Sequence, residues 1–137
     1  MNSSEEQRKS NYLESIESRI REDGGNDKAV DFARQLLQRI PSPELQSADV
    51  SEHAALARDF FEFVQQRRRH EVKIRTVNPE RERDGWESSH TILEIINDDM
   101  PFLVDSVVLV LSELGLSAHL IIHPVMRVRR DEGGNWL

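Results

Sequence analysis

Hydrophobic residues in the first half of the chain recur every three or four positions, the spacing that places side chains on one face of an α-helix. Asn26 or Asp27 can cap the second of these patterns, and Asp49 or Ser51 can cap the third. The sequence therefore predicts three amphipathic helices whose apolar faces can pack together. The apolar positions are Tyr12, Leu13, Ile16 and Ile20 in the first pattern, Val30, Ala33, Leu37 and Ile40 in the second, and Leu56, Phe60, Phe63 and Val64 in the third.

From residue 72 the pattern changes to that of a sheet. Apolar and charged residues alternate over 72–76, which predicts a half-exposed strand, and residues 91–97 are apolar on both faces, which is typical of a central strand. Residues 103–114 carry a broad apolar arc that predicts a helix packed on this sheet, and residues 119–130 alternate again. Strand, helix and strand in this order predict a βαβ unit with a parallel sheet.

The chain is therefore predicted to be α+β, in two parts. Residues 1–70 form an N-terminal helical segment, and residues 71–137 form the start of a sheet domain on which the helices pack. Asp131-Glu132-Gly133-Gly134 is typical of a hairpin turn, and Asn135-Trp136-Leu137 begins a strand that the chain does not finish. We expect the sheet to be incomplete within these 137 residues and to continue beyond them.

Composition restricts the functions open to the chain. It contains no cysteine, which removes disulfides and cysteine-bound zinc, and its net charge of −7 argues against general nucleic-acid binding. The longest apolar block, residues 107–111, is far shorter than the roughly 20 residues of a membrane helix, and the polar residues 1–9 do not resemble a secretory signal. We expect a cytoplasmic segment that binds neither nucleic acid nor membrane and has no metal site.

The acidic turn between the second strand and its helix is the strongest candidate site. Free N–H groups at the start of the helix can bind a carboxylate, and the acidic side chains can bind an ammonium group, so the turn can hold an amino acid. The structural alternative is that Asp98 or Asp99 caps the helix and Pro101 begins its first turn. A third interpretation, paired carboxylates as general acid and base, lacks an accompanying nucleophile or histidine. The turn comprises Asn97, Asp98, Asp99, Met100, Pro101 and Phe102.

Three further features have a structural and a functional interpretation. Phe102 and Leu109 fall on the polar side of the predicted helix, where large apolar residues mark a contact with another domain or subunit, or else a tuck under a loop. His119 and His123 lie about 13 Å apart on a strand, too far to share a metal, and are expected to be half-buried on a sheet face or at an interface. The basic run at 67–70 follows the third helix, where it complements the helix dipole or binds an acidic partner.

Two ungapped strings carry a resemblance to a known family. They are Ile95-Ile96-Asn97-Asp98-Asp99-Met100-Pro101-Phe102-Leu103-Val104-Asp105-Ser106-Val107 and His119-Leu120-Ile121-Ile122-His123-Pro124-Val125, preceded in the same order by Val77-Asn78-Pro79, Gly85-Trp86 and His90-Thr91. Together they resemble the first ACT-like domain of the large bacterial NAD-specific glutamate dehydrogenases. The resemblance covers residues 72–134 well and the preceding helices only loosely.

The resemblance implies an incomplete ACT-like sheet of the ferredoxin-like βαβ type, within a large, homo-oligomeric, cytoplasmic enzyme. Such enzymes oxidatively deaminate L-glutamate to 2-oxoglutarate and ammonia with NAD. Because this segment has no nucleotide-binding or catalytic motif, we expect it to be non-catalytic, to bind no cofactor itself and to serve in regulation or assembly. Its implied partners are the rest of the same polypeptide and other subunits.

One position departs from the family pattern. ACT modules enter their first helix through a turn resembling Asp-x-Pro-Gly-Leu, and residues 99–103 match it except that Phe102 replaces the glycine. Glycine lets a bound amino acid approach the backbone, whereas phenylalanine is expected to fill that space. The resemblance therefore favours the fold more than ligand binding, and an amino-acid sensor without catalytic activity is the alternative function.

Overall fold

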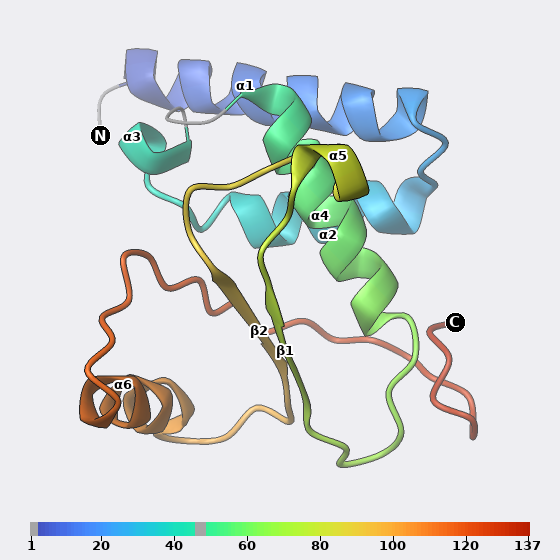
Figure 1. Cartoon of the computed structure of the whole chain (residues 1–137). Helices are drawn as coiled ribbons and strands as arrows, with labels where there is room; N and C mark the ends of the chain where they lie inside the picture. Colours follow the sequence, from blue (N-terminus) through green and yellow to red (C-terminus); the bar gives the residue numbers. More distant parts are fainter. Residues whose placement is uncertain (1–2, 46–48) are drawn as a thin grey trace.

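The computed structural model describes residues 3–45 and 49–137. The helices α1, α2 and α4 form a layer from which two strands lead away, and α6 lies near the far end of these strands (Figure 1). The predicted α+β class is confirmed. The elements are α1 (Ser3–Glu22), α2 (Asp27–Leu37), α3 (Ser42–Leu45), α4 (Val50–Val64), β1 (Lys73–Val77), α5 (Arg81–Asp84), β2 (Ile92–Ile96) and α6 (Leu103–Glu113).

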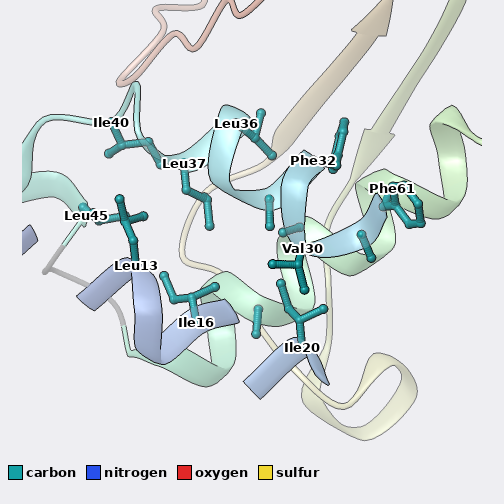
Figure 2. Packing of buried hydrophobic residues seen from close by; sticks show 14 of the residues in the cluster. Leu13, Ile16, Ile20, Val30, Phe32, Leu36, Leu37, Ile40, Leu45 and Phe61 are labelled. Carbon is teal, nitrogen blue, oxygen red and sulfur yellow. The ribbon is translucent and has the colours of Figure 1, made fainter. Parts of the chain in front are cut away.

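The three predicted helices form and pack around one core. Asn26 caps α2 and Asp49 caps α4, each side-chain oxygen accepting a hydrogen bond from the backbone N–H three residues further on. Ile16, Ile20 and Leu37, all from the predicted apolar positions, are almost completely buried, and Figure 2 shows them where α1 and α2 meet. Each such side chain contributes roughly 1.5–3 kcal/mol on burial, so the helical layer is the stable part of the chain.

The sheet differs from the predicted one. β1 and β2 are antiparallel, with Lys73 opposite Ile96 and Val77 opposite Ile92, and residues 97–137 contain no strand. The predicted parallel βαβ pair is therefore wrong, and so is the central position of residues 91–97, since β2 pairs only with β1 within the described residues. Parallel pairs occur in sheets that are covered on both faces, which these two strands cannot form alone.

One face of the β1–β2 pair packs on α4 through charged side chains. Glu94 is buried and accepts a hydrogen bond from Arg75, whose Nη2 also donates to the Asp59 carbonyl at 3.1 Å. The Arg75 guanidinium lies 4.3 Å from the ring centre of Phe63, and Trp86 Nε1 donates to Asp59 Oδ2 at 2.8 Å. These contacts fix the strands on the helical layer. The opposite face leaves three large apolar side chains exposed: Val72, Ile74 and Leu93.

The helix α6 does not pack on the sheet as predicted. None of its residues is buried, and Val110 and Leu114, from the arc predicted to face the sheet, are 52% and 68% exposed. The prediction fails because a helix needs a sheet wide enough to receive its apolar face, and the described chain supplies only two strands. Phe102 and Leu109 are also exposed, in agreement with their position on the polar side.

Residues 119–129 belong to no strand and no helix. Ile122 and Met126 pack against the helical core, whereas Leu120 and Val128, from the same predicted face, are exposed. The predicted strand is therefore wrong, although its apolar positions are partly covered. Its backbone lacks a neighbouring strand within the described chain.

The C-terminal hairpin turn is confirmed. Asp131 N–H donates to the Asn135 carbonyl at 3.0 Å, and Arg130 and Trp136 form an antiparallel bridge. Trp136 N–H donates in turn to the Gln65 carbonyl at 2.9 Å. The last residues of the chain are thus attached to the end of α4.

Candidate functional site

A partly open cavity of about 220 Å³, hereafter the junction cavity, lies where the helical layer, the acidic turn and the C-terminal segment meet. Apolar side chains contribute most of its wall, and polar side chains come from three separate parts of the sequence. The apolar wall includes Phe32, Leu36, Phe60, Val64, Met126 and Trp136. The polar lining is Arg67, Asn97, Asp98, Asp99, His123 and Arg130.

Asp98 holds the acidic turn against the chain that follows α4. Its Oδ1 accepts a hydrogen bond from Arg67 Nη2 at 2.8 Å, and its Oδ2 accepts one from His70 Nδ1 at 2.6 Å. These bonds, from His70 and then Arg67, hold the pKa of the Asp98 carboxyl below its ordinary value. Of the two interpretations of the basic run at 67–70, the structure supports the acidic partner, which here belongs to the same chain.

Neither Asp98 nor Asp99 caps α6, so the capping prediction is wrong. The residue at the cap position is Phe102, which makes no side-chain capping bond and has a left-handed backbone with φ of 64°. The physical reason is that Asp98 is engaged by Arg67 and His70. The left-handed φ also explains the glycine of the ACT pattern, because glycine adopts this conformation without steric cost.

The second half of the acidic turn lies outside the junction cavity. Met100, Pro101 and Phe102 are exposed and are absent from its lining. Phe102 is 76% exposed, so its ring is directed to solvent and does not fill the cavity beside the turn. The expectation that this ring blocks the space next to Asp99 therefore does not hold for this cavity.

The two predicted histidines occupy different places. His123 lines the junction cavity, whereas the ring of His119 stacks on that of His90 with centres 4.6 Å apart and planes inclined by 16°. Among the described residues there is no group of three or more side chains that could hold a metal ion. Both imidazoles are exposed and lie on no strand, so the prediction that they are half-buried on a sheet face is wrong, and the structure brings one of the two to the candidate site.

Arg130 is a charged residue of the cavity that the sequence did not reveal. Its Nη1 donates to the carbonyls of Gln65 and Gly134 at 3.1 and 2.9 Å, and it forms no ion pair with any described residue. Burial, and then the positive charge of Arg67, lowers the pKa of Arg130. The predicted hairpin turn that follows Arg130 could have indicated that this arginine lies near α4, because the turn leads the chain back to the end of that helix.

Comparison with known proteins assigns the chain to a family. Residues 32–137 match the family described as Glutamate dehydrogenase, ACT1 domain. The chain belongs to this ACT1 family. The match runs from within α2 to the end of the chain, so it includes every element that lines the junction cavity, and it confirms the resemblance carried by the two ungapped strings.

Two curated relatives agree with the family match. The NAD-specific glutamate dehydrogenase of Halomonas elongata is 30% identical over 131 residues, which are 93% of this chain and 8% of the relative. That of Pseudomonas aeruginosa is 34% identical over 103 residues, which are 75% of this chain and 6% of the relative. This ACT1 chain thus spans a small part of their length.

No solved structure matches the chain. In the described part of the chain, no helix is both long enough and apolar enough to cross a membrane.

Proposed function

We propose that this ACT1 chain is a regulatory and assembly segment of a NAD-dependent glutamate dehydrogenase that converts L-glutamate to 2-oxoglutarate and ammonia. The observation that carries the proposal is the apolar surface that the ACT1 elements leave uncovered. α6 has no buried residue, and Ile74 and Leu109 are 60% and 61% exposed. Large exposed apolar patches mark interaction surfaces. The rest of a longer polypeptide and other subunits of a homo-oligomer are the partners that this surface fits.

Catalysis and NAD binding belong to other parts of the parent enzyme in this proposal. The sequence contains no glycine-rich phosphate loop after a strand. Within the described residues, the junction cavity has no serine, threonine or lysine next to its single histidine, so it offers no activated nucleophile. The segment acts on the enzyme through contacts and not through chemistry.

The first test uses the isolated 137-residue chain. We expect it to have no glutamate dehydrogenase activity and to bind no NAD, because it lacks a nucleotide-binding motif. Trp86 and Trp136 provide a fluorescence signal for a titration with NAD, and calorimetry provides a second one. Saturable binding at micromolar NAD would contradict the expectation.

The second test uses the full-length dehydrogenase that carries this segment. Leu109→Lys places a charge on the uncovered face of α6, whereas Ser112→Lys adds the same charge at an exposed polar position of the same helix. We expect the first variant to weaken oligomer assembly or regulation and to leave the KM for NAD unchanged, and the second to behave like wild type. A change in the KM for NAD without any change in assembly or regulation would oppose the proposed role.

The second candidate function is an amino-acid sensor. The observation that favours it is that Asn97, Asp98 and Asp99 line the junction cavity, so half of the predicted effector turn is accessible to a ligand. Asn97→Ala is then expected to change the response of the parent enzyme to amino acids while its melting temperature stays the same. If the response is unchanged, the segment serves assembly alone.

A further inference from the structure

The charges around the junction cavity are not fully paired. Arg67 is neutralised by Asp98, which it contacts through Nη2. Arg130 lines the same cavity and has no carboxylate partner among the described residues, because only its Nη1 is engaged, and by two carbonyls. A guanidinium with free donors at the wall of a cavity favours an anionic group, above all a carboxylate.

The two arginines come together in space although they are far apart in sequence. Arg67 N–H donates to the Gly134 carbonyl at 2.9 Å, and Arg130 Nη1 donates to that same carbonyl. The side chain of Arg67 is only 14% exposed, and Arg130 is half-buried. Both arginines line the same cavity, where Asp98 pairs with Arg67 and leaves the Arg130 guanidinium for a second anionic group.

The rest of the cavity is suited to an apolar group. Phe32 and Phe60 line it together with Trp136 and Met126, and its volume is about 220 Å³. An apolar cavity of about 150 Å³ already holds a benzene molecule, so a branched four- or five-carbon tail fits. Asp99, exposed and without an ion pair among the described residues, lies on the same lining and can accept an ammonium group.

We propose that the junction cavity binds a small organic carboxylate with an apolar tail, the carboxylate against Arg130 and the tail against the aromatic wall. The proposal gives the regulatory part of the proposed function a ligand class and rests on it. It assigns the carboxylate contact to a residue outside the acidic turn. The ligand is either an apolar α-amino acid, which also uses Asp99, or a simple carboxylic acid, which does not.

The experiment titrates the 137-residue chain with four probes in a calorimeter, with NMR to locate the shifts. The probes are leucine, 4-methylpentanoate, the neutral alcohol 4-methylpentan-1-ol, and acetate, which lacks the tail. We expect saturable binding of leucine or 4-methylpentanoate and much weaker binding of the alcohol and of acetate. Leucine binding alone identifies the amino acid, and equal binding of both acids identifies the simple carboxylate. Equal binding of the alcohol, or no binding of either acid, overturns the proposal.

Two pairs of variants locate the site. Arg130→Gln is expected to weaken binding about tenfold or more, and Arg129→Gln, which removes the same charge from an exposed neighbour, is expected to leave it unchanged. Val125→Trp closes the cavity from a lining position that is 55% exposed and so leaves the fold intact, while Val110→Trp is its control on α6, at 52% exposure. Equal affinities within both pairs contradict the proposal, whatever the stability of the Arg130 variant.

The experiments distinguish a failure of the carboxylate site from a failure of the proposed regulatory and assembly role. Binding is measured on the isolated chain, whereas the regulatory and assembly role is measured in the parent enzyme. If the chain binds the carboxylate but the α6 variants do not affect the parent enzyme, the carboxylate site is supported and the proposed regulatory and assembly role is refuted. A chain that binds nothing leaves the assembly role intact.

Discussion

Among the described residues, two residues other than glycine adopt a left-handed backbone, and one of them is a partner of Asp98. They are His70, with φ of 61°, and Phe102, with φ of 64°. This conformation costs a residue with a Cβ atom about 1–2 kcal/mol, so surrounding contacts must hold it in place. The bond between His70 and Asp98 supplies one such contact. Phe102 is exposed and shows no comparable compensation in its side chain.

Phe102→Gly is expected to stabilise the start of α6 by about 1 kcal/mol. Glycine removes the left-handed strain, and the exposed ring loses little buried surface. The matched control is Leu109→Gly, which replaces another exposed apolar residue in the middle of α6 and is expected to cost about 1 kcal/mol. Hydrogen exchange of the α6 amides measures both. Faster exchange in the Phe102 variant would show that its ring supports the helix.

The carboxyl of Asp98 makes the stability of the chain depend on pH in the acid range. His70 and Arg67 lower its pKa in the folded state. Its contribution is therefore complete above the ordinary aspartate pKa and is lost as the pH falls through the lowered folded value. Asp98→Asn is expected to lose less stability than wild type on acidification, whereas Asp99→Asn should follow the wild-type curve. Thermal melts from pH 6 down to 2 compare the three proteins.

At the scale of elements, the join between the sheet and the helical layer depends on Arg75. Arg75 neutralises the buried Glu94 and contacts α4, while burial raises the pKa of Glu94. Arg75→Met is expected to destabilise the chain by about 2 kcal/mol at neutral pH, because it leaves Glu94 buried without a partner. Arg81→Met removes two ion pairs of an exposed arginine, with Glu52 and Glu87, and should cost close to nothing.

The direction of the pH effect tests this explanation. A carboxyl whose folded pKa is raised favours the folded state at low pH and loses that contribution as the pH rises through the folded value. The Arg75 variant should therefore recover stability on mild acidification, and the added change Glu94→Gln should recover it at neutral pH. Urea denaturation at two pH values measures the recovery. An unchanged deficit at both values would assign the role of Arg75 to its contact with Phe63.

The elements also show what the sequence can and cannot specify. The caps Asn26 and Asp49 and the buried positions of α1, α2 and α4 were predictable, because a helix closes its own hydrogen bonds and its partners lie within this chain. The strand predicted at 119–130 was not recovered, because a strand exists only with a neighbour. The residues that line the junction cavity shared no motif, and Arg130 reaches it only through the C-terminal hairpin.

At the scale of the whole molecule, the chain consists of a well-packed helical layer and a sheet region with much of its apolar surface uncovered. Four large apolar side chains of this region are more than half exposed: Val72 just before β1, Ile74 on β1, Leu109 on α6 and Leu114 just after α6. Hydrophobic burial scales with area removed from water, so covering these side chains is favourable. This distribution favours contacts with other protein surfaces, and it determines how the isolated chain should behave.

We expect the isolated chain to self-associate through these surfaces. Within the described part of the chain, the outer edges of β1 and β2 have no neighbouring strand. These edges and the apolar face of α6 both favour contact with another copy when the natural partner is absent. Light scattering and sedimentation over a range of concentrations measure the association. Leu109→Lys should weaken it with little loss of helix content, because that side chain is 61% exposed and supports no core.

The controls separate the two surfaces. Ser112→Lys adds a charge to α6 at a polar position and should leave association unchanged, while Ile74→Lys tests the sheet at a residue that is 60% exposed. If only Ile74→Lys dissociates the oligomer, the copies associate through the sheet. If only Leu109→Lys does so, they associate through α6. A monomer at every concentration would mean that neither surface has enough affinity for a second copy, and the natural cover of α6 would then have to be sought in the rest of the parent polypeptide.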